Sequence, residues 1–297
     1  YAVIEMGANH PGEIAWLSRL ARPTVALITQ CAPAHLEGFG SVDGVARAKA
    51  EIFSGLDENG TAVVNADDDY AGLWQESARH YRQISFGVKN KADLTASDIQ
   101  FDPDSGNTRF TLHTPAGAVS VNLPLAGEHN VLNSLAAAAC CQALEIPIQR
   151  IKTGLERMIN VSGRMQMKST SQGARIFDDT YNANPVSLKA GLQVLSRYPG
   201  RKWLILGDMG ELGLQAEAFH RQAGEMARTC GIERVYALGD QSRLVAEGFG
   251  EGARHFDSPQ ALLESVKPEL ARDVTILVKG SRSMAMDGIV DSMMEGS

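Results

Sequence analysis

The chain has 297 residues, with 28 Lys and Arg against 35 Asp and Glu, which gives a formal net charge of −7. A hydrophobic content of 44% suffices for ordinary packed cores and argues against disorder. The negative charge argues against broad binding of nucleic acid or anionic membranes. No stretch approaches the ~20 apolar residues of a membrane span, and the length suggests two domains.

The four cysteines are Cys31, Cys140, Cys141 and Cys230, and none is spaced as CxxC. This pattern favours reduced, buried thiols over a disulfide or a zinc site. Because the sequence opens on no secretory signal, we expect a cytoplasmic protein. The opening run Tyr1–Met6 reads as a strand already under way, which predicts that the chain is part of a longer polypeptide.

The first half predicts mixed α and β structure. Short apolar runs bounded by turn residues predict strands at 2–5, 25–29 and 62–65. Helices are predicted at 12–20 and 42–53, the second with Ser41 as its N-cap. An alternating pattern then predicts an antiparallel meander at 94–99, 109–113 and 119–123. Two more helices are predicted at 129–143 and 147–158.

The second half alternates strands with helices. Strands are predicted at 175–178, 202–206, 234–237 and 275–278. Helices are predicted at 186–196, 216–229, 259–270 and 283–293. Such alternation is typical of a parallel sheet with crossover helices. We therefore expect an α/β fold with two domains, 1–162 and 163–297.

Polar residues gather where predicted strands of the first half end. Glu5 ends the first strand, His35 lies in the loop after the second, and Lys49 lies on the following helix. Because open α/β sheets bind ligands at the carboxyl ends of strands, these residues are candidates for a metal and phosphate site. Singly, each has a simpler interpretation: Glu5 as a helix-cap partner, His35 as a loop histidine, and Lys49 as a solvated helix residue or a partner of Glu51.

Two asparagines lie one helical turn apart, at Asn130 and Asn133. Amides offer paired donors and acceptors, so this face could contact an adenine edge. An N-cap role for Asn130 fits the spacing equally well.

Two further clusters follow predicted strands of the second half. Asp178 and Asp179 could bind ribose hydroxyls or a cation, whereas Asn184 before Pro185 suits a helix N-cap. The segment Lys279–Ser283 combines two cations with hydroxyls, which suits a carboxylate or phosphate. The glycine-rich turn 207–213 is not GxGxxG, and the sequence has no GxxxxGK[ST] Walker A loop.

Six segments occur in a fixed order: EMGANHPGEI (5–14), AHLEGFGS (34–41), AKAEIF (48–53), GEHN (127–130), DTYNANP (179–185) and VKGSRS (278–283). Together they resemble the Mur ligases, and within that family the branch that adds D-alanyl-D-alanine. The likeness begins in the middle of the family's central ATPase domain, which has a mixed sheet with an antiparallel meander. The likeness continues through a C-terminal Rossmann-like domain. The family's N-terminal domain and Walker A loop have no counterpart in this sequence.

The resemblance implies an ATP-dependent amide ligation in peptidoglycan precursor synthesis. ATP phosphorylates the terminal carboxylate of UDP-N-acetylmuramoyl-tripeptide, and the amine of D-alanyl-D-alanine attacks the acyl phosphate. It implies two Mg²⁺ ions, and a catalytic and metal-binding set of Glu5, His35 and a carbamylated Lys49. It implies nucleotide contacts at Asn130, Asn133, Arg164 and Asp179. The implied substrate contacts are Tyr181, Asn182, Asn184, Lys279, Ser281 and Arg282.

Three alternatives stay open. The Mur ligase that adds the diamino acid fits less well, because its Asp-Asn-Pro-Arg signature is missing. Folylpolyglutamate synthase shares the fold but fits the segments 9–12 and 181–184 worse. A non-catalytic nucleotide- or peptide-binding module is the third, because the Walker A loop is missing. In every case we expect a monomer that neither binds nucleic acid nor inserts into a membrane.

Overall fold

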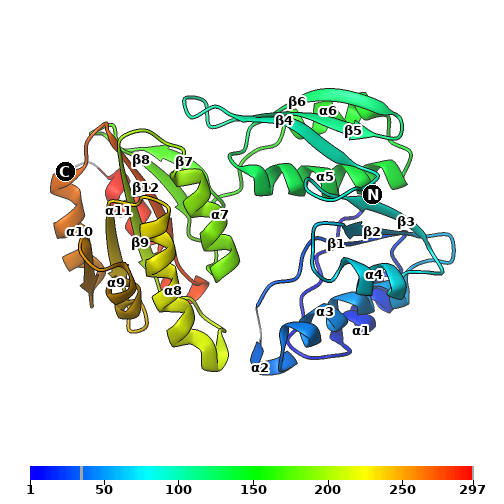
Figure 1. Cartoon of the computed structure of the whole chain (residues 1–297), viewed down its shortest axis with the longest axis horizontal. Coiled ribbons are helices and arrows are strands. Elements are labelled where there is room, and N and C mark those ends of the chain that lie inside the picture. Colours follow the sequence, from blue (N-terminus) through cyan, green and yellow to red (C-terminus); the bar gives the residue numbers. More distant parts are fainter. Residues whose placement is uncertain (34–35, 296–297) are drawn as a thin grey trace. The chain divides into compact units, whose positions relative to one another are not determined.

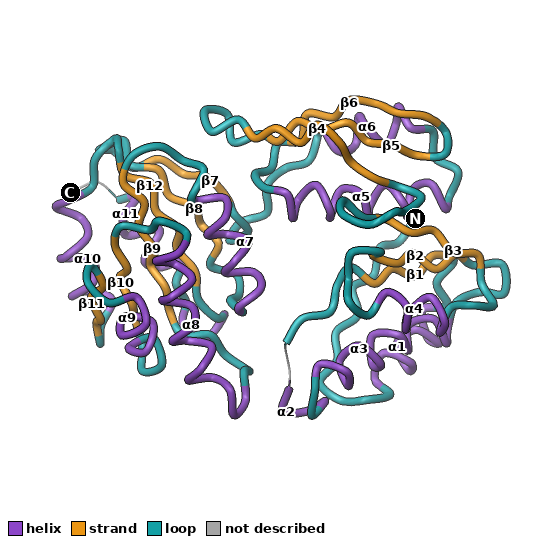
Figure 2. The backbone as a smooth tube through the Cα atoms, viewed as in Figure 1, coloured by secondary structure: helices purple, strands orange, loops and turns teal. Residues whose placement is uncertain are grey.

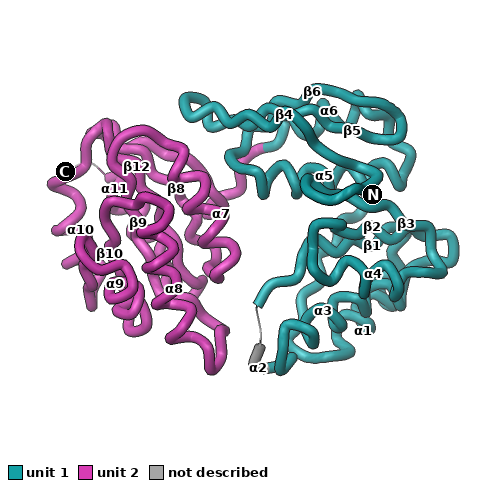
Figure 3. Tube along the Cα trace, in the orientation of Figure 1, with its two compact units in different colours: residues 1–158 teal, residues 159–297 magenta. Residues whose placement is uncertain are grey.

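The computed structural model describes residues 1–33 and 36–295 (Figure 1). No helix in this described part is both long and apolar enough to cross a membrane. The chain divides into two compact units, Tyr1–Met158 and Ile159–Ser297. Each unit has its own sheets and helices (Figures 2 and 3).

Unit 1 contains a parallel sheet of three strands in the order β1-β2-β3. The strands are β1 (Val25–Ile28), β2 (Thr61–Asn65) and β3 (Arg82–Phe86). The first two match the predicted strands. The third is absent from the predictions, because it opens on the exposed polar residues Arg82 and Gln83 and shows only a short apolar signal.

The strand predicted at 2–5 is wrong for the described structure. Residues 1–8 form no regular element, and Tyr1 and Val3 are fully exposed. β1 is the end strand of its sheet, and no described segment pairs with its outer edge. A lone apolar run has no ladder of hydrogen bonds to hold it extended, so a correct local pattern produces no strand.

The helices of unit 1 are α1 (Glu13–Ala21), α2 (Leu36–Phe39), α3 (Val42–Ala50), α4 (Ala71–Ser77), α5 (Glu128–Ala143) and α6 (Ile148–Glu156). Ser41 caps α3 as predicted, since its side chain accepts a hydrogen bond from Gly44 N. The predicted helix to residue 53 ends earlier, and the chain continues as the 3₁₀ turn Glu51–Gly55.

The predicted meander is confirmed. The strands β4 (Thr95–Phe101), β5 (Thr108–Thr114) and β6 (Gly117–Leu123) pair antiparallel in sequence order. They form their own sheet, and a single isolated bridge between Phe86 and Leu94 leads to them from β3. Their inward side chains pack in one core with α5, α6 and residues of the parallel sheet such as Val63 and Ile84.

Unit 2 is built on one six-stranded sheet in the order β11-β10-β9-β12-β8-β7. The strands are β7 (Gln166–Ser169), β8 (Arg175–Asp179), β9 (Arg201–Gly207), β10 (Arg234–Leu238), β11 (Ala253–Phe256) and β12 (Val274–Lys279). All pairs are parallel except β7 with β8. The four predicted strands are confirmed. The two edge strands are short and partly polar, so they carry no clear signal in the sequence.

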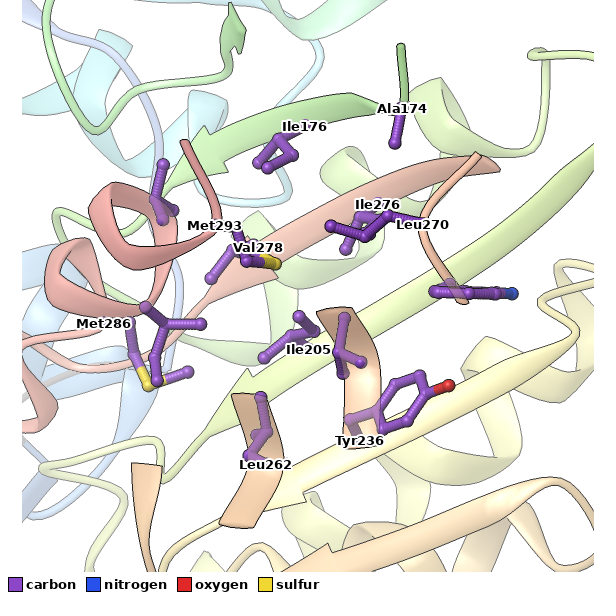
Figure 4. Packing of buried hydrophobic residues seen from close by; sticks show 14 of the residues in the cluster. Ala174, Ile176, Ile205, Tyr236, Leu262, Leu270, Ile276, Val278, Met286 and Met293 are labelled. Atoms are coloured by element: carbon purple, nitrogen blue, oxygen red, sulfur yellow. The ribbon is translucent and has the colours of Figure 1, made fainter. Parts of the chain in front are cut away.

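Helices cover both faces of this sheet. They are α7 (Pro185–Leu195), α8 (Ala216–Thr229), α9 (Arg243–Phe249), α10 (Pro259–Val266) and α11 (Asp287–Met294). Contacts join α7 to α8 and α8 to α9, whereas α10 contacts α11. Alternate residues of the central strands, such as Ile176, Ile205 and Ile276, pack with α10 and α11 in one core (Figure 4). The intervening residues therefore face the α7 side, because successive side chains alternate across a sheet.

The four cysteines are free thiols. Burial raises the pKa of Cys140 to about 12. Burial, together with the charges of Asp68 and Asp43, raises the pKa of Cys31 to about 11, although Lys49 opposes this shift.

Slow alkylation of these two thiols is the expected consequence. At pH 8, a rise of about 2 in the pKa of a thiol reduces its thiolate fraction roughly 100-fold. We expect iodoacetamide to label Cys31 and Cys140 at least about tenfold more slowly than the same residues in urea, because intrinsic nucleophilicity offsets part of the loss. Labelling should accelerate as the pH rises towards 11. Peptide mass spectrometry reads each site, and labelling of Cys140 at the unfolded rate would contradict the expectation.

Candidate functional site

The carboxyl ends of β8 and β12 form the centre of the candidate site in unit 2. The two strands are neighbours, and Lys279 lies beside Asp179 in their register. β8 leads into α7 on one face, whereas β12 leads towards α11 on the other. Open α/β sheets bind ligands at points where the loops of neighbouring strands leave for opposite faces of the sheet.

Lys279 and Asp179 form a buried ion pair at these strand ends. Lys279 is 2% exposed, and its Nζ lies 2.5 Å from Asp179 Oδ2 and 2.8 Å from the carbonyl oxygen of Asn182. The other carboxylate oxygen of Asp179 accepts Met165 N at 3.2 Å. Burial lowers the pKa of Lys279 and raises that of Asp179, and their mutual attraction opposes both shifts. The ammonium therefore faces protein acceptors and holds the loop after β8 against β12.

The neighbouring carboxylate points the other way. Asp178 Oδ2 lies 2.9 Å from Lys168 Nζ, and Oδ1 accepts the hydroxyl of Thr180 at 2.7 Å. Consecutive strand residues face opposite sides of a sheet, so Asp178 and Asp179 do not act as a pair. Only Asp179 lies on the side of the strand that faces Lys279.

Two arginines gather at the ring of Tyr181. The guanidinium carbon of Arg164 lies 4.2 Å from the ring centroid, and that of Arg282 lies 6.0 Å from it. Tyr181 is 48% exposed, so an arriving ligand can reach the ring. Within the described part of the chain, neither arginine makes an ion pair. The charge of Arg164 also acts on the nearby Asp179 carboxylate, where it opposes the rise in pKa that burial causes. Two exposed guanidinium groups from different loops suit a phosphate or a carboxylate.

The asparagines of the loop after β8 bind the backbone. Asn184 caps α7 as predicted, because its side-chain oxygen accepts Ser187 N at 2.8 Å while Ser187 Oγ accepts Asn184 N. Pro185 occupies the first helical position. Asn182 Oδ1 accepts Ala183 N at 2.8 Å. These bonds give the loop one conformation, with Tyr181 exposed at its start.

The segment after β12 is a short turn. Ser281 is buried, and its N–H donates to the carbonyl oxygen of Asp208 at 2.9 Å. Arg282 is exposed at the start of the 3₁₀ turn Arg282–Met284. The helix predicted from residue 283 begins only at Asp287, because Ala285 interrupts it with a left-handed conformation at φ 47°.

The candidate adenine contacts lie on α5 of unit 1. Gly127 is the N-cap of this helix, so the N-cap role that the spacing allows for Asn130 is wrong. Asn130 instead donates from Nδ2 to the carbonyl oxygen of Ala126 at 2.8 Å, and Asn133 Nδ2 lies 3.5 Å from Asn130 Oδ1. The two amides lie on one face of α5, and the contact between them orients both side chains.

The three candidate metal residues also belong to unit 1. Glu5 is exposed in the irregular opening stretch, Lys49 is half-buried in the last turn of α3, and His35 lies outside the described residues. Among the residues that are described, no group of three or more His, Cys, Asp or Glu side chains could hold a metal ion.

The role of Glu51 is not evident from the sequence. Its position two residues after Lys49 suggests a pair with that lysine, yet its carboxylate accepts Gly12 N at 2.8 Å and Ala15 N at 3.1 Å. Glu51 thus caps α1 and ties the loop before that helix to the segment that carries Lys49. Only the tertiary fold brings positions 12 and 51 together, so no local pattern could have indicated this contact.

Comparisons with known proteins give a consistent result. The family models for the Mur ligase middle domain and for the Mur ligase glutamate ligase domain match residues 1–141 and 163–282. The chain is similar to the UDP-N-acetylmuramoyl-tripeptide–D-alanyl-D-alanine ligase of Escherichia coli (strain K12), with 46% identity over 99% of this chain and 65% of that protein.

Solved structures agree. The fold is similar to MurF from Acinetobacter baumannii, with a TM-score of 0.93 and 35% identity, over 100% of this chain and 65% of that one. It is also similar to MurF from Thermotoga maritima in complex with ADP, with a TM-score of 0.87 and 26% identity, over 98% of this chain and 66% of that one. The chain thus spans just under two thirds of the length of these relatives. Since the two family models together match most of its residues, the chain belongs to the Mur ligase family.

Proposed function

We propose that this chain carries the nucleotide- and amine-binding parts of an ATP-dependent ligase that joins D-alanyl-D-alanine to UDP-N-acetylmuramoyl-tripeptide. The observation that carries the proposal is the cluster of side chains at the carboxyl ends of β8 and β12, where Tyr181 and two exposed arginines lie close to Asp179. The names of the E. coli relative and of the Acinetobacter structure supply the substrates. Residues 1–162 would then be part of the central ATP-binding domain, and residues 163–297 the C-terminal ligase domain.

Each unit supplies candidate nucleotide contacts of its own. In unit 1, Asn130 and Asn133 lie on one face of α5, and the donor and acceptor positions that their bonds to Ala126 and to each other leave open would contact an adenine edge. In unit 2, Asp179 would accept the ribose hydroxyls, and Lys279 supports that carboxylate in a fixed orientation. Arg164 would place its guanidinium against phosphate charge. The ADP in the Thermotoga maritima relative supports a nucleotide as the ligand.

The dipeptide would lie at the exposed face of Tyr181. The amine of D-alanyl-D-alanine must meet the acyl phosphate of the tripeptide in a productive orientation, and positioning of this kind contributes up to ~7–11 kcal/mol. Arg282 offers a cation for the dipeptide carboxylate, and Ser281, Asn182 and Asn184 frame the loops on either side. The amine nitrogen then attacks the acyl carbon, and phosphate leaves with the bonding electron pair.

Two Mg²⁺ ions are part of the proposal, with Glu5, His35 and Lys49 as the residues that would hold them. Bound Mg²⁺ would neutralise phosphate charge. The described residues fit this role only if Lys49 is carbamylated, because an ammonium repels a cation whereas a carbamate offers two oxygen ligands. ATP and UDP-sugar substrates favour a cytoplasmic enzyme, and we propose that it acts as a monomer.

A ligation assay with matched amine substrates tests the proposal. The protein is used as the 297-residue chain and as a polypeptide extended with the part of the E. coli relative that this chain does not cover. We expect the extended protein to release phosphate only when ATP, UDP-N-acetylmuramoyl-tripeptide and D-alanyl-D-alanine are all present. We expect the 297-residue chain alone to be inactive, since it has no Walker A loop for the ATP phosphates.

The alternatives give different results in this assay. Phosphate release with a diamino acid or with glutamate, and none with D-alanyl-D-alanine, would assign another ligase of the same fold. Nucleotide binding without any ligation by the extended protein would favour a binding module.

A further inference from the structure

Three loops meet at the carboxyl edge of the unit 2 sheet, after β9, β10 and β12. Asp208 joins all three. Its Oδ1 accepts the backbone N of Ser242 at 2.7 Å and the Ser242 hydroxyl at 2.5 Å. Its carbonyl oxygen accepts the N–H of Ser281 at 2.9 Å. One residue of the β9 loop therefore holds the loops on both neighbouring strands.

Tight packing fixes the spacing of these loops. Gly239 has φ +115°, and a Cβ there would lie 2.7 Å from the Asp208 carboxylate. A Cβ on Gly280 would lie 2.6 Å from Met286 and 3.3 Å from Cα of Gly207. Contacts shorter than 3 Å would force the neighbours apart, so glycine at 239 and 280 lets the loops approach to hydrogen-bonding distance.

His220 of α8 anchors the junction of the three loops that follow β9, β10 and β12. Its side chain is fully buried, and its Nε2 accepts the N–H of Met209 at 2.9 Å. Its Nδ1 lies 2.7 Å from the carbonyl oxygen of Ala216 and donates to it. An imidazole that accepts at Nε2 and donates at Nδ1 is neutral, with its proton on Nδ1. Without it, the N–H of Met209, which is also buried, would lose its acceptor.

We propose that His220 and Asp208 are positioning residues for the Ser281–Arg282 segment. The bonds run from His220 to Met209, through the peptide unit to Asp208, and from the Asp208 carbonyl to Ser281. Both residues would act through hydrogen bonds within the protein and not by contact with a substrate. The inference rests on the proposed function, in which Ser281 and Arg282 face the incoming dipeptide.

The position of the junction predicts a selective effect. The candidate nucleotide residue Asp179, at the end of β8, is held by Lys279 of β12 and by the N–H of Met165, which directly precedes β7. None of these bonds passes through His220 or Asp208. Loosening the junction should therefore weaken use of the dipeptide and leave use of ATP nearly unchanged. A purely structural histidine would show no such selectivity.

The test compares His220→Leu with His220→Gln. The amide oxygen of glutamine reaches the place of Nε2 and can accept from Met209, whereas leucine has similar bulk and no acceptor. Amide hydrogen exchange of the 297-residue chain is the first readout. In His220→Leu we expect at least about tenfold faster exchange at Met209 and Ser281, with the Met165 amide within about twofold of wild type. In His220→Gln we expect all three within about threefold.

The second readout is kinetic and uses the extended polypeptide. We expect His220→Leu to raise the KM for D-alanyl-D-alanine at least about tenfold, while the KM for ATP stays within about twofold of wild type. In His220→Gln we expect the KM for D-alanyl-D-alanine to return most of the way to the wild-type value. If His220→Leu folds poorly, Ser242→Ala replaces it. That variant removes one donor to Asp208 and should raise the dipeptide KM about threefold.

Opposite results would overturn the proposal. Unchanged exchange at Ser281 in His220→Leu, or equal increases at Ser281 and Met165, would show that the junction does not position this segment specifically. Equal rises of both KM values would do the same. A wild-type polypeptide that turns over no D-alanyl-D-alanine would instead refute the proposed function, and the exchange data would still decide whether the junction holds Ser281.

Discussion

Replacing Lys49 with alanine is expected to lower the ligase activity of the extended polypeptide at least about a hundredfold, the scale seen when one group that stabilises transition-state charge is removed. Lys49 lies half-buried in the last turn of α3, close enough to Cys31 to influence the pKa of its thiol. Glu51 caps α1, so an ion pair with Glu51 does not account for this lysine. In the proposed function this lysine would be a carbamate, which forms from the neutral amine and CO₂ and would carry two oxygens for Mg²⁺.

Two controls separate the carbamate from a plain positive charge. Lys49→Arg keeps the charge but cannot form the carbamate, and we expect it to be as inactive as Lys49→Ala. A short-chain carboxylic acid should restore part of the activity of Lys49→Ala, because it can fill the gap with a carboxylate. Steady-state phosphate release measures each case. Wild-type activity in Lys49→Arg would contradict the carbamate.

Replacing Lys279 with methionine is expected to destabilise unit 2 by about 3–5 kcal/mol, the cost of leaving one charge of a buried ion pair without its partner. Methionine fills most of the space of the lysine stem but leaves the Asp179 carboxylate buried without its ammonium. Urea unfolding measures the loss, followed by the fluorescence of Trp203, which is buried in the unit 2 sheet. Trp16 and Trp74 are replaced by phenylalanine in every sample so that unit 1 does not contribute.

The matched control is the double variant Lys279→Met with Asp179→Asn. Removing both charges should cost less than the sum of the single variants, with a coupling of ~0.5–3 kcal/mol. The pH dependence supplies a second check. Burial already raises the pKa of Asp179, and loss of Lys279 raises it further. The penalty of Lys279→Met should therefore be full at neutral pH and shrink as the pH falls and Asp179 is protonated. Additive losses, or a penalty below about 1 kcal/mol, would argue against a strong ion pair.

The elements that the sequence predicts best have strong local signals. The helix predicted at 216–229 coincides with α8, and Ser41 and Asn184 cap their helices as expected. The strands that the sequence does not reveal, such as β7 and β11, are short edge strands whose existence depends on a neighbour. The run at 2–5 shows the reverse case, because it has the pattern of a strand but no described partner.

Some features of the candidate site can likewise be predicted from the sequence, whereas others depend on tertiary packing. The predicted strand ends alone place Asp179 and Lys279 at one edge of the sheet. Local sequence does not reveal that Lys279 is buried against Asp179, or that Asp178 faces the opposite side. The contact between His220 and Met209 spans eleven residues across a loop, and it forms only when α8 packs beside β9. Such contacts follow from tertiary packing and leave no trace in local periodicity.

The most direct test of the central claim follows one oxygen atom. UDP-N-acetylmuramoyl-tripeptide labelled with ¹⁸O in its terminal carboxylate is incubated with ATP, D-alanyl-D-alanine and the extended polypeptide. If an acyl phosphate forms and the dipeptide amine displaces phosphate, each phosphate released carries one ¹⁸O from the carboxylate, and the product is the amide-linked pentapeptide. Unlabelled phosphate, or labelled phosphate without the amide product, would contradict the account.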